Sequence, residues 1–290
     1  MNFNIRSLRK VFISELAPLY PENECRSMFA IVVEFVLGLN RTQQAISNDE
    51  NIAVHDTTRL LAVLTELKTG KPIQYITGTT EFCGLQLEVN PDVLIPRQET
   101  EECIMHLVAN YGEKIHRILD LGTGSGCIAI SLAKHIENAG VFATDISEKA
   151  ILTAKRNAIA NQCNVNFSIW DMTVDDYSGF PGLFDLIISN PPYITEAEKS
   201  LMHSNVLNFE PHSALFVPDD DPLKFYRHIA SLGMEKLTSS GLLVVEINEN
   251  LGNETSGLFS QTGFRNISLR HDVFGKDRFL FMQKNNPKPE

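Results

Sequence analysis

Four residues suited to ligand binding follow an apolar run late in the chain. The run at residues 184–188 is typical of a buried strand, and Ser189 and then Asn190-Pro191-Pro192-Tyr193 come directly after it. The prolines end the strand because proline has no N–H for a ladder hydrogen bond. In an open α/β sheet, ligands bind just beyond the carboxyl ends of the strands. We therefore expect an asparagine, a stiff backbone and an aromatic ring to face a ligand there.

A glycine-rich turn follows an earlier predicted strand, at residues 117–121. Its sequence is Gly122-Thr123-Gly124-Ser125-Gly126, and a helix is expected after it. Glycine lets the backbone approach a ligand closely, and the helix presents free N–H groups. Such a turn could bind NAD, another nucleotide or S-adenosylmethionine. The Gly-x-Gly-x-Gly spacing differs from that of dinucleotide sites, and the lack of a lysine after the glycines disfavours phosphoryl transfer.

Three aspartates stand beside or at the ends of predicted strands. Asp120 precedes the glycine turn and could orient it or meet an ammonium group. Asp145 ends a strand at residues 141–145, where an acidic residue can pair with ribose hydroxyls, as it also does in NAD proteins. Asp171 follows the strand at residues 165–169 and could accept a hydrogen bond from an adenine amino group. Any one of them could instead be a helix cap or a solvated strand end, but together with the two motifs they indicate a ligand site.

The elements that position these residues alternate between strand and helix, which predicts an α/β domain. The strands are expected at residues 117–121, 141–145, 165–169, 184–189 and 242–247, with a closing antiparallel pair at 264–270 and 278–284.

The domain organisation follows from changes in pattern along the chain. Residues 1–71 carry apolar stripes at helical spacing and are expected to form a small helical domain. Residues 72–96 contain alternating apolar residues and turn signals, which predict a β-hairpin linker. Residues 97–290 form the α/β domain. The helical domain could be a packing or dimerisation module, or a docking domain for a macromolecular substrate.

Composition narrows the class of protein. The 290 residues are 43% hydrophobic and 21% charged, which is typical of a globular protein. The net charge of −11 argues against a large non-specific nucleic-acid footprint. No apolar run approaches the roughly 20 residues of a membrane span, and the N-terminus lacks a signal-peptide pattern, so we expect a cytoplasmic protein. The five cysteines lie far apart, so no metal site is expected.

Residues 120–126 together with residues 190–193 resemble class I S-adenosylmethionine-dependent methyltransferases that act on a planar nitrogen. Two further segments, residues 72–78 and residues 93–101, are similar to the peptide chain release factor glutamine methyltransferases of the HemK/PrmC type. Residues 209–216 resemble the same family. The resemblance spans most of the chain. It implies a Rossmann-like class I methyltransferase domain with a seven-stranded mixed sheet, preceded by a small N-terminal helical bundle and a β-hairpin linker.

The resemblance also implies a reaction. The cofactor would be S-adenosyl-L-methionine, the product S-adenosyl-L-homocysteine, and the substrate the glutamine in the Gly-Gly-Gln loop of class 1 peptide chain release factors. No membrane and no direct nucleic-acid partner is expected. The residues expected to be catalytic are Asn190, Pro191, Pro192 and Tyr193. The residues expected to bind the cofactor are Asp120, Gly122, Thr123, Gly124, Ser125, Gly126, Asp145, Asp171, Met172, Asn190, Arg97 and Thr100.

A mechanism follows for an amide substrate. An amide nitrogen is a poor nucleophile because its lone pair is delocalised into the carbonyl. The Asn190 side-chain oxygen and the Pro191 carbonyl could accept the two amide N–H groups. Acceptors outside the amide plane would favour a pyramidal nitrogen, which is stabilisation concentrated in the transition state. Tyr193 would pack on the amide and exclude water.

Several departures from the family pattern flank this region, among them Gln98 where a second proline is usual and Asp221-Pro222 where Asp-Gly is usual. Asn248 stands where the family commonly has glycine. Trp170 precedes Asp171 and Met172, where the family often has Asp-Trp. These departures bear on the contacts to adenine rather than on the reaction.

Three alternative functions share parts of these motifs. An adenine-N6 DNA or RNA methyltransferase would carry the same tetrad and cofactor site, although the acidic charge and the linker segment disfavour it. A ribosomal-protein glutamine methyltransferase shares the tetrad but differs in the linker. A cofactor-binding regulatory protein without catalysis would not need Asn190.

Overall fold

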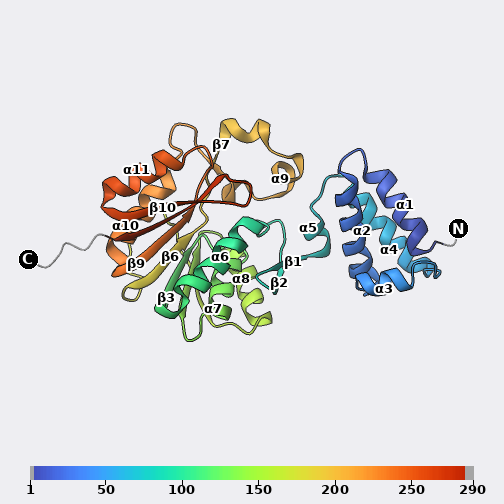
Figure 1. Cartoon of the computed structure of the whole chain (residues 1–290), viewed down its shortest axis with the longest axis horizontal. Coiled ribbons are helices and arrows are strands. Elements are labelled where there is room, and N and C mark those ends of the chain that lie inside the picture. Colours follow the sequence, from blue (N-terminus) through green and yellow to red (C-terminus); the bar gives the residue numbers. More distant parts are fainter. Residues whose placement is uncertain (1–2, 285–290) are drawn as a thin grey trace, which may run out of the picture. The chain divides into compact units, whose positions relative to one another are not determined.

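The computed structural model describes residues 3–284, which form two compact units (Figure 1). Within the described residues, the first unit comprises 3–78 together with 203–209, and the second comprises 79–202 together with 210–284. Each unit has its own hydrophobic core. No helix among the described residues is long and apolar enough to span a membrane. No cluster of potential metal ligands occurs among them.

The first unit is helical. Its helices are α1 (Ile5–Leu16), α2 (Glu22–Leu37), α3 (Arg41–Ile46), α4 (Val54–Leu67), α5 (Ile73–Thr77) and α9 (Ser204–Phe209). The apolar stripes pack together, with the rings of Phe12 and Phe29 edge to face at 5.1 Å. The short helix α3 was not predicted, although Asn40 begins it with a capping box to Gln43.

The linker differs from its prediction in one respect. The hairpin β1 (Thr79–Phe82) and β2 (Leu85–Glu88) occupies only part of the span 72–96, because residues 73–77 form the helix α5. Pro72 stands just before this helix, where its fixed φ suits a helix start. Gly78 ends it with a φ of 75°, a conformation that favours glycine. These two residues explain why one helical turn forms where an extended segment was expected.

The second unit contains a seven-stranded mixed sheet in the order β10-β11-β9-β6-β3-β4-β5. Its strands are β3 (Arg117–Leu121), β4 (Gly140–Asp145), β5 (Val165–Ile169), β6 (Phe184–Ser189), β9 (Leu237–Glu246), β10 (Phe264–His271) and β11 (Asp277–Lys284). Only β11 runs in the opposite direction: it pairs antiparallel with both β10 and β9, and the other neighbouring strands pair parallel. The predicted fold class is confirmed. A further two-residue pair joins β7 (Ile194–Thr195) to β8 (Phe216–Val217).

Helices cover both faces of this sheet (Figure 1). One core contains residues of α6 (Gln98–Tyr111), α7 (Cys127–His135) and α8 (Glu148–Ala160), and the other contains residues of α10 (Lys224–Lys236) and α11 (Gly252–Thr262). Strand β3 contributes to both because its side chains alternate: Ile118 belongs to the first core and Leu119 to the second. The central strands are therefore buried on both faces, as parallel strands usually are.

The register places the two sequence motifs side by side. Leu121, the last residue of β3, pairs with Ser189 at the end of β6 and with Thr144 on β4. The glycine turn after β3 and the Asn-Pro-Pro-Tyr segment after β6 therefore leave the sheet from neighbouring strand ends.

A substitution at Gly126 tests how tightly the glycine turn packs against α7 and α8. It has a φ of 82°, and a Cβ there would lie 2.8 Å from Ile130 Cδ1 and 3.0 Å from Ala154 Cβ. We expect Gly126→Ala to lower the free energy of unfolding by about 2–4 kcal/mol, from backbone strain and overpacking combined. Gly124→Ala is the matched control, since Gly124 has a φ of 56° but open space around its Cβ position. It should lose only about 1–2 kcal/mol. If urea unfolding showed the same loss of stability for both variants, this packing would be contradicted.

Candidate functional site

A cavity of about 310 Å³ lies at the carboxyl ends of the parallel strands of the second unit. It is lined by the turn after β3, the end of β4 and the segments after β5 and β6. The predicted site residues in its wall are Arg97, Thr100, Gly122, Thr123, Gly124, Ser125, Asp145, Asp171, Met172, Asn190 and Pro192. The predicted residues outside its wall are Asp120, Gly126, Pro191 and Tyr193.

The glycine turn presents its backbone to this cavity. The N–H groups of Gly122 and Thr123 both donate to the Thr144 carbonyl at 2.9 Å, which fixes the turn against β4. A Cβ placed on Gly124 would meet nothing within 4 Å. A Cβ on Gly122 would lie 3.1 Å from Met172 Cε. A ligand can therefore approach the backbone at Gly124 as closely as a glycine allows.

Asp145 shapes the turn from the next strand. Its Oδ2 accepts the Gly124 N–H and its Oδ1 accepts the Ser147 N–H, both at 2.9 Å. Burial raises the pKa of this carboxyl, and the backbone hydrogen bonds oppose that rise. Each oxygen has a second lone pair for a ligand hydroxyl. Asp145 can therefore hold the turn and a ligand at the same time.

Asp171 stands at another part of the wall. Its Oδ1 accepts hydrogen bonds from the backbone N–H and the hydroxyl of Thr173, both at 2.8 Å. Within residues 3–284 its Oδ2 has no hydrogen-bond partner, so this oxygen can accept a donor from a ligand. The neighbouring Trp170 ring packs edge to face on Phe180 at 4.9 Å and lines the cavity beside Met172.

Asp120 supports the glycine turn from its position near the end of β3. It is completely buried, and its Oδ2 accepts a hydrogen bond from the Thr123 hydroxyl at 2.6 Å. Its Oδ1 is also buried and has no partner among the described residues. Burial raises the pKa of Asp120 to about 7. The structure therefore places Asp120 behind the turn, where it can orient Thr123.

The buried carboxyl makes stability depend on pH. The unfolded chain loses the Asp120 proton near pH 3.9, whereas the folded protein keeps it to about pH 7. The folded state then binds more protons between these values, so this residue lowers the free energy of unfolding as pH rises through that window. Asp120→Asn carries no such proton. We expect the variant to gain about 3 kcal/mol relative to the wild type between pH 4.5 and pH 8. Urea unfolding at both pH values measures this, and an unchanged difference would contradict it.

Asn190 provides a free amide at the cavity wall. It is half-buried, and its side chain makes no hydrogen bond to any other residue in the described range. The residue before it is fixed, because the Ser189 hydroxyl donates to the Leu121 carbonyl at 2.8 Å. Pro191, the next residue, is buried. The Asn190 side-chain amide is therefore available to a ligand.

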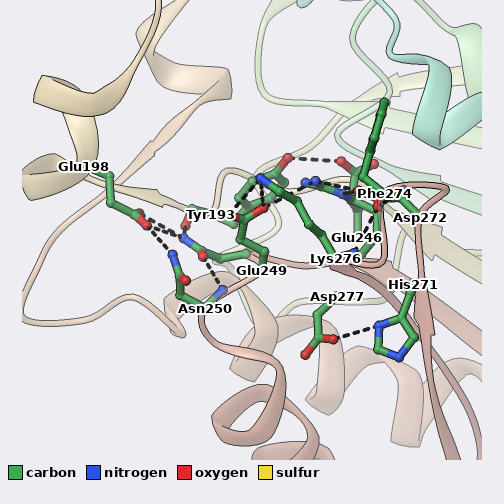
Figure 2. Close-up of polar contacts among 12 residues, drawn as sticks. Tyr193, Glu198, Glu246, Glu249, Asn250, His271, Asp272, Phe274, Lys276 and Asp277 are labelled. Atoms are coloured by element: carbon green, nitrogen blue, oxygen red, sulfur yellow. Dashed lines mark hydrogen bonds and ion pairs between the residues drawn. The ribbon is translucent and has the colours of Figure 1, made fainter.

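Tyr193 is held away from the cavity by an acid that the sequence analysis did not select (Figure 2). Its hydroxyl donates to Glu246 Oε1 at 3.0 Å, and the Thr100 hydroxyl donates to Glu246 Oε2 at 2.7 Å. Glu246 is 2% exposed, and burial raises its pKa. The sequence signal that could have identified Glu246 is that it is a single acidic residue at the end of the apolar run 242–245. Glu246 therefore connects the tetrad to the cavity residue Thr100.

Asn248 holds Tyr193 from its other end. Its Nδ2 lies 3.1 Å from the Tyr193 carbonyl and 2.9 Å from Glu198 Oε2. Its Oδ1 accepts the Asn250 N–H at 2.9 Å, and Asn250 also donates to Glu198 (Figure 2). The residue where glycine is common in the resembling family is thus the centre of a polar network. This network fixes the backbone just after the tetrad.

Glu210 fixes the segment that contains Ile95 and Arg97. Its side chain is 1% exposed. It accepts a hydrogen bond from the Arg97 guanidinium at 2.7 Å and another from the Ile95 N–H at 3.2 Å. Pro96 and Arg97 thereby become part of the cavity wall. Lys224 and Phe225 at the start of α10 also line the cavity and were not predicted.

Comparisons with known proteins agree with this arrangement. Residues 99–209 match the family model of the methyltransferase small domain, and residues 8–78 match that of the PrmC N-terminal domain. The chain is 43% identical to the release factor glutamine methyltransferase of Flavobacterium psychrophilum, covering 95% of this chain and 98% of that protein. It is 41% identical to the protein of that name from Bacteroides thetaiotaomicron, covering 91% and 95%. Among solved structures, a methyltransferase from Pyrococcus furiosus has the same fold, with a TM-score of 0.52 and 20% identity over 70% of this chain and 90% of that one.

Proposed function

Because the chain belongs to the family of release factor glutamine methyltransferases, we propose that it methylates the side-chain amide nitrogen, N5, of a release-factor glutamine. The methyl donor is S-adenosylmethionine, and the glutamine is that of the Gly-Gly-Gln loop of class 1 release factors. One observation carries the proposal: the unbonded amide of Asn190 and the glycine turn line the same cavity. The site of action is the cytoplasm, where release factors work.

The residues in the cavity wall fit this cofactor. The open space at Gly124 lets the methionine part of the cofactor lie close to the backbone of the turn. Asp145 can accept its ribose hydroxyls, and the unpartnered Oδ2 of Asp171 can accept its adenine amino group. Trp170, Met172 and Phe225 provide apolar surface in the same wall. These assignments use the lone pairs that the protein's own hydrogen bonds leave available.

The tetrad then acts on the substrate amide. When bound, the cofactor supplies a methyl group on a positively charged sulfur, which keeps the electron pair of the broken bond. Asn190 Oδ1 and the Pro191 carbonyl accept the two amide N–H groups and hold the nitrogen with its lone pair out of the amide plane. This stabilises the transition state more than the ground state. The nitrogen loses one proton to water after the new C–N bond has formed.

Tyr193 keeps these acceptors in position. Glu246 holds its hydroxyl and Asn248 holds its carbonyl, so the residue at the end of the tetrad is fixed at both ends. Its ring packs against the core formed with α10 and α11. Because Tyr193 lies outside the cavity wall and its ring packs on this core, it does not fit the lid over the substrate amide that was expected from the sequence. We assign it the role of fixing the backbone of the tetrad, and Glu246 and Asn248 the role of positioning residues for it.

Incubation with labelled S-adenosylmethionine and purified release factor tests the proposed function. The wild-type release factor should gain label, and a release factor with the loop glutamine changed to alanine should not. Label that persists on the alanine form would exclude the glutamine assignment. DNA, RNA and ribosomal protein are tested in parallel. Methylation of one of these, with none on the release factor, would support an alternative substrate.

A further inference from the structure

The turn between β10 and β11 carries two exposed apolar side chains that the proposed reaction does not use. Val273 is 68% exposed and Phe274 is 77% exposed. We call residues 272–276 the apolar tip. Apolar surface in water costs free energy that burial against a partner would recover. Because single exposed apolar residues are common on protein surfaces, the rigidity, charge and place of the tip decide what these two side chains do.

The apolar tip is built rigidly around one carboxylate. The Asp272 side chain is 1% exposed. Its Oδ1 accepts the N–H groups of Phe274 and Lys276 at 2.9 and 3.0 Å, and its Oδ2 accepts a hydrogen bond from the Arg278 guanidinium at 3.0 Å. The Lys276 ammonium is held in turn by Glu249 at 2.8 Å (Figure 2). The backbone that carries the two exposed side chains is therefore ordered before a partner binds, which lowers the entropic cost of binding.

The charges of the apolar tip are already balanced. Its two charged residues are Asp272 and Lys276, and both are paired with neighbouring side chains. Next to the tip, His271 Nδ1 lies 2.9 Å from Asp277 Oδ1. Residues 272–276 therefore offer a partner apolar surface and no unpaired charge. Such a surface fits an apolar patch of another protein, whereas a nucleic acid would need free cations.

The apolar tip projects from the edge of the sheet at which the tetrad lies. Phe279 on β11 pairs with Glu246, the last residue of β9, so the residues before β11 extend past the carboxyl end of β9. Ser189, which precedes the tetrad, pairs with Val245 on the same strand. A protein that presents one residue to the tetrad therefore approaches the edge from which the tip projects.

A third exposed apolar side chain comes from the segment after the tetrad. Leu201 is 84% exposed and ends the short 3-10 helix η2 (Glu196–Leu201). Glu198 on this helix accepts a hydrogen bond from Asn250 at 3.2 Å, and the adjacent Glu249 binds the tip (Figure 2). One short stretch of chain thus connects η2 to the apolar tip, and both carry exposed apolar side chains.

We propose that the apolar tip, together with Leu201, is a docking surface for an apolar patch of the release factor that flanks the methylated loop. This inference rests on the proposed function, since the release factor is its substrate. The contact contributes to recognition of the folded protein and not to methyl transfer. It acts on the KM for the release factor. Because the contact is apolar, its effect should not weaken as salt is added, unlike that of exposed ion pairs.

The double variant Val273→Ser/Phe274→Ser tests this assignment in the full chain. Its KM for the full-length release factor should rise about tenfold or more, at low and at high salt, because a buried aromatic residue can dominate the affinity of an interface. Its kcat, its KM for S-adenosylmethionine and its urea unfolding should not change, since both side chains are exposed. Phe274→Leu, which keeps an apolar side chain, should retain most of the wild-type affinity.

Ile159→Ser is the matched control. Ile159 is 78% exposed, almost the same as Phe274. It lies near the end of α8, which begins after the carboxyl end of β4 and ends before β5 begins, so it stands at the opposite edge of the sheet. Loss of this apolar side chain should leave the KM for the release factor at the wild-type value.

The outcomes separate this inference from the proposed function. A wild-type enzyme that does not methylate release factor contradicts the proposed function, and this inference with it. A wild-type enzyme that does, with an unchanged KM in the folded double variant, overturns the docking assignment alone. A photo-crosslinking p-benzoylphenylalanine at position 274 provides the second arm and should attach to the release factor. Attachment only to a second copy of this chain would overturn the assignment and identify the tip as a surface for self-association.

Discussion

Replacing Asn190 by alanine is expected to lower kcat for release-factor methylation by about 100- to 1,000-fold, the cost of removing one preorganised polar group at a reacting centre. The alanine side chain cannot accept the substrate N–H, and the Pro191 carbonyl alone cannot hold the nitrogen lone pair out of the amide plane. Stability should change little, because the Asn190 side chain has no hydrogen bond to another described residue. Steady-state kinetics with urea unfolding of the same variant measure both quantities.

Asn253→Ala is the matched control for this prediction, since Asn253 is exposed on α11 and lies outside the cavity wall. Cofactor affinity should be measured for both variants by titration calorimetry, because Asn190 also faces the cofactor cavity. If Asn190→Ala retained the wild-type kcat, the proposed role of the tetrad would be wrong. A loss of cofactor binding large enough to explain the lost activity would also contradict it.

Replacing Glu246 by alanine is expected to have the next largest effect, on both stability and activity. It leaves the buried hydroxyls of Tyr193 and Thr100 without their acceptor. An unsatisfied buried polar group costs about 1–3 kcal/mol, so the free energy of unfolding should fall by about 2–4 kcal/mol. The kcat should fall by at least about tenfold, because Tyr193 no longer fixes the backbone that carries the Asn190 and Pro191 acceptors.

A double-mutant cycle isolates the contact that carries this effect. Glu246→Gln keeps the size of the side chain, and Tyr193→Phe removes only the hydroxyl. If the hydrogen bond positions Tyr193, the two changes should be non-additive in kcat, with a coupling of about 0.5–3 kcal/mol. Strictly additive effects on kcat would show that Glu246 acts on stability alone.

Local signals were enough to predict the strands of the sheet and the segments after them that line the cavity, and 11 of the 15 expected site residues stand in its wall. Parallel strands buried on both faces appear as continuous apolar runs, and β3 to β6 lie within one residue of the predicted positions. The glycine turn and the tetrad meet because neighbouring parallel strands end at the same edge. The cofactor contacts and the catalytic roles remain proposals.

The residues that hold the site together could not be found in this way. Thr100 and Glu246 are 146 positions apart, and Arg97 and Glu210 are 113 apart. Periodicity describes one element at a time and contains no information about which distant side chains meet.

One measurement tests the central claim most directly. Release factor incubated with the enzyme and S-adenosylmethionine is digested, and tandem mass spectrometry locates the added methyl group. The account predicts one methyl group on the side-chain nitrogen of the glutamine in the Gly-Gly-Gln loop, with wild-type enzyme and not with Asn190→Ala. A methyl group on any other residue, or the same yield from both enzymes, would contradict it.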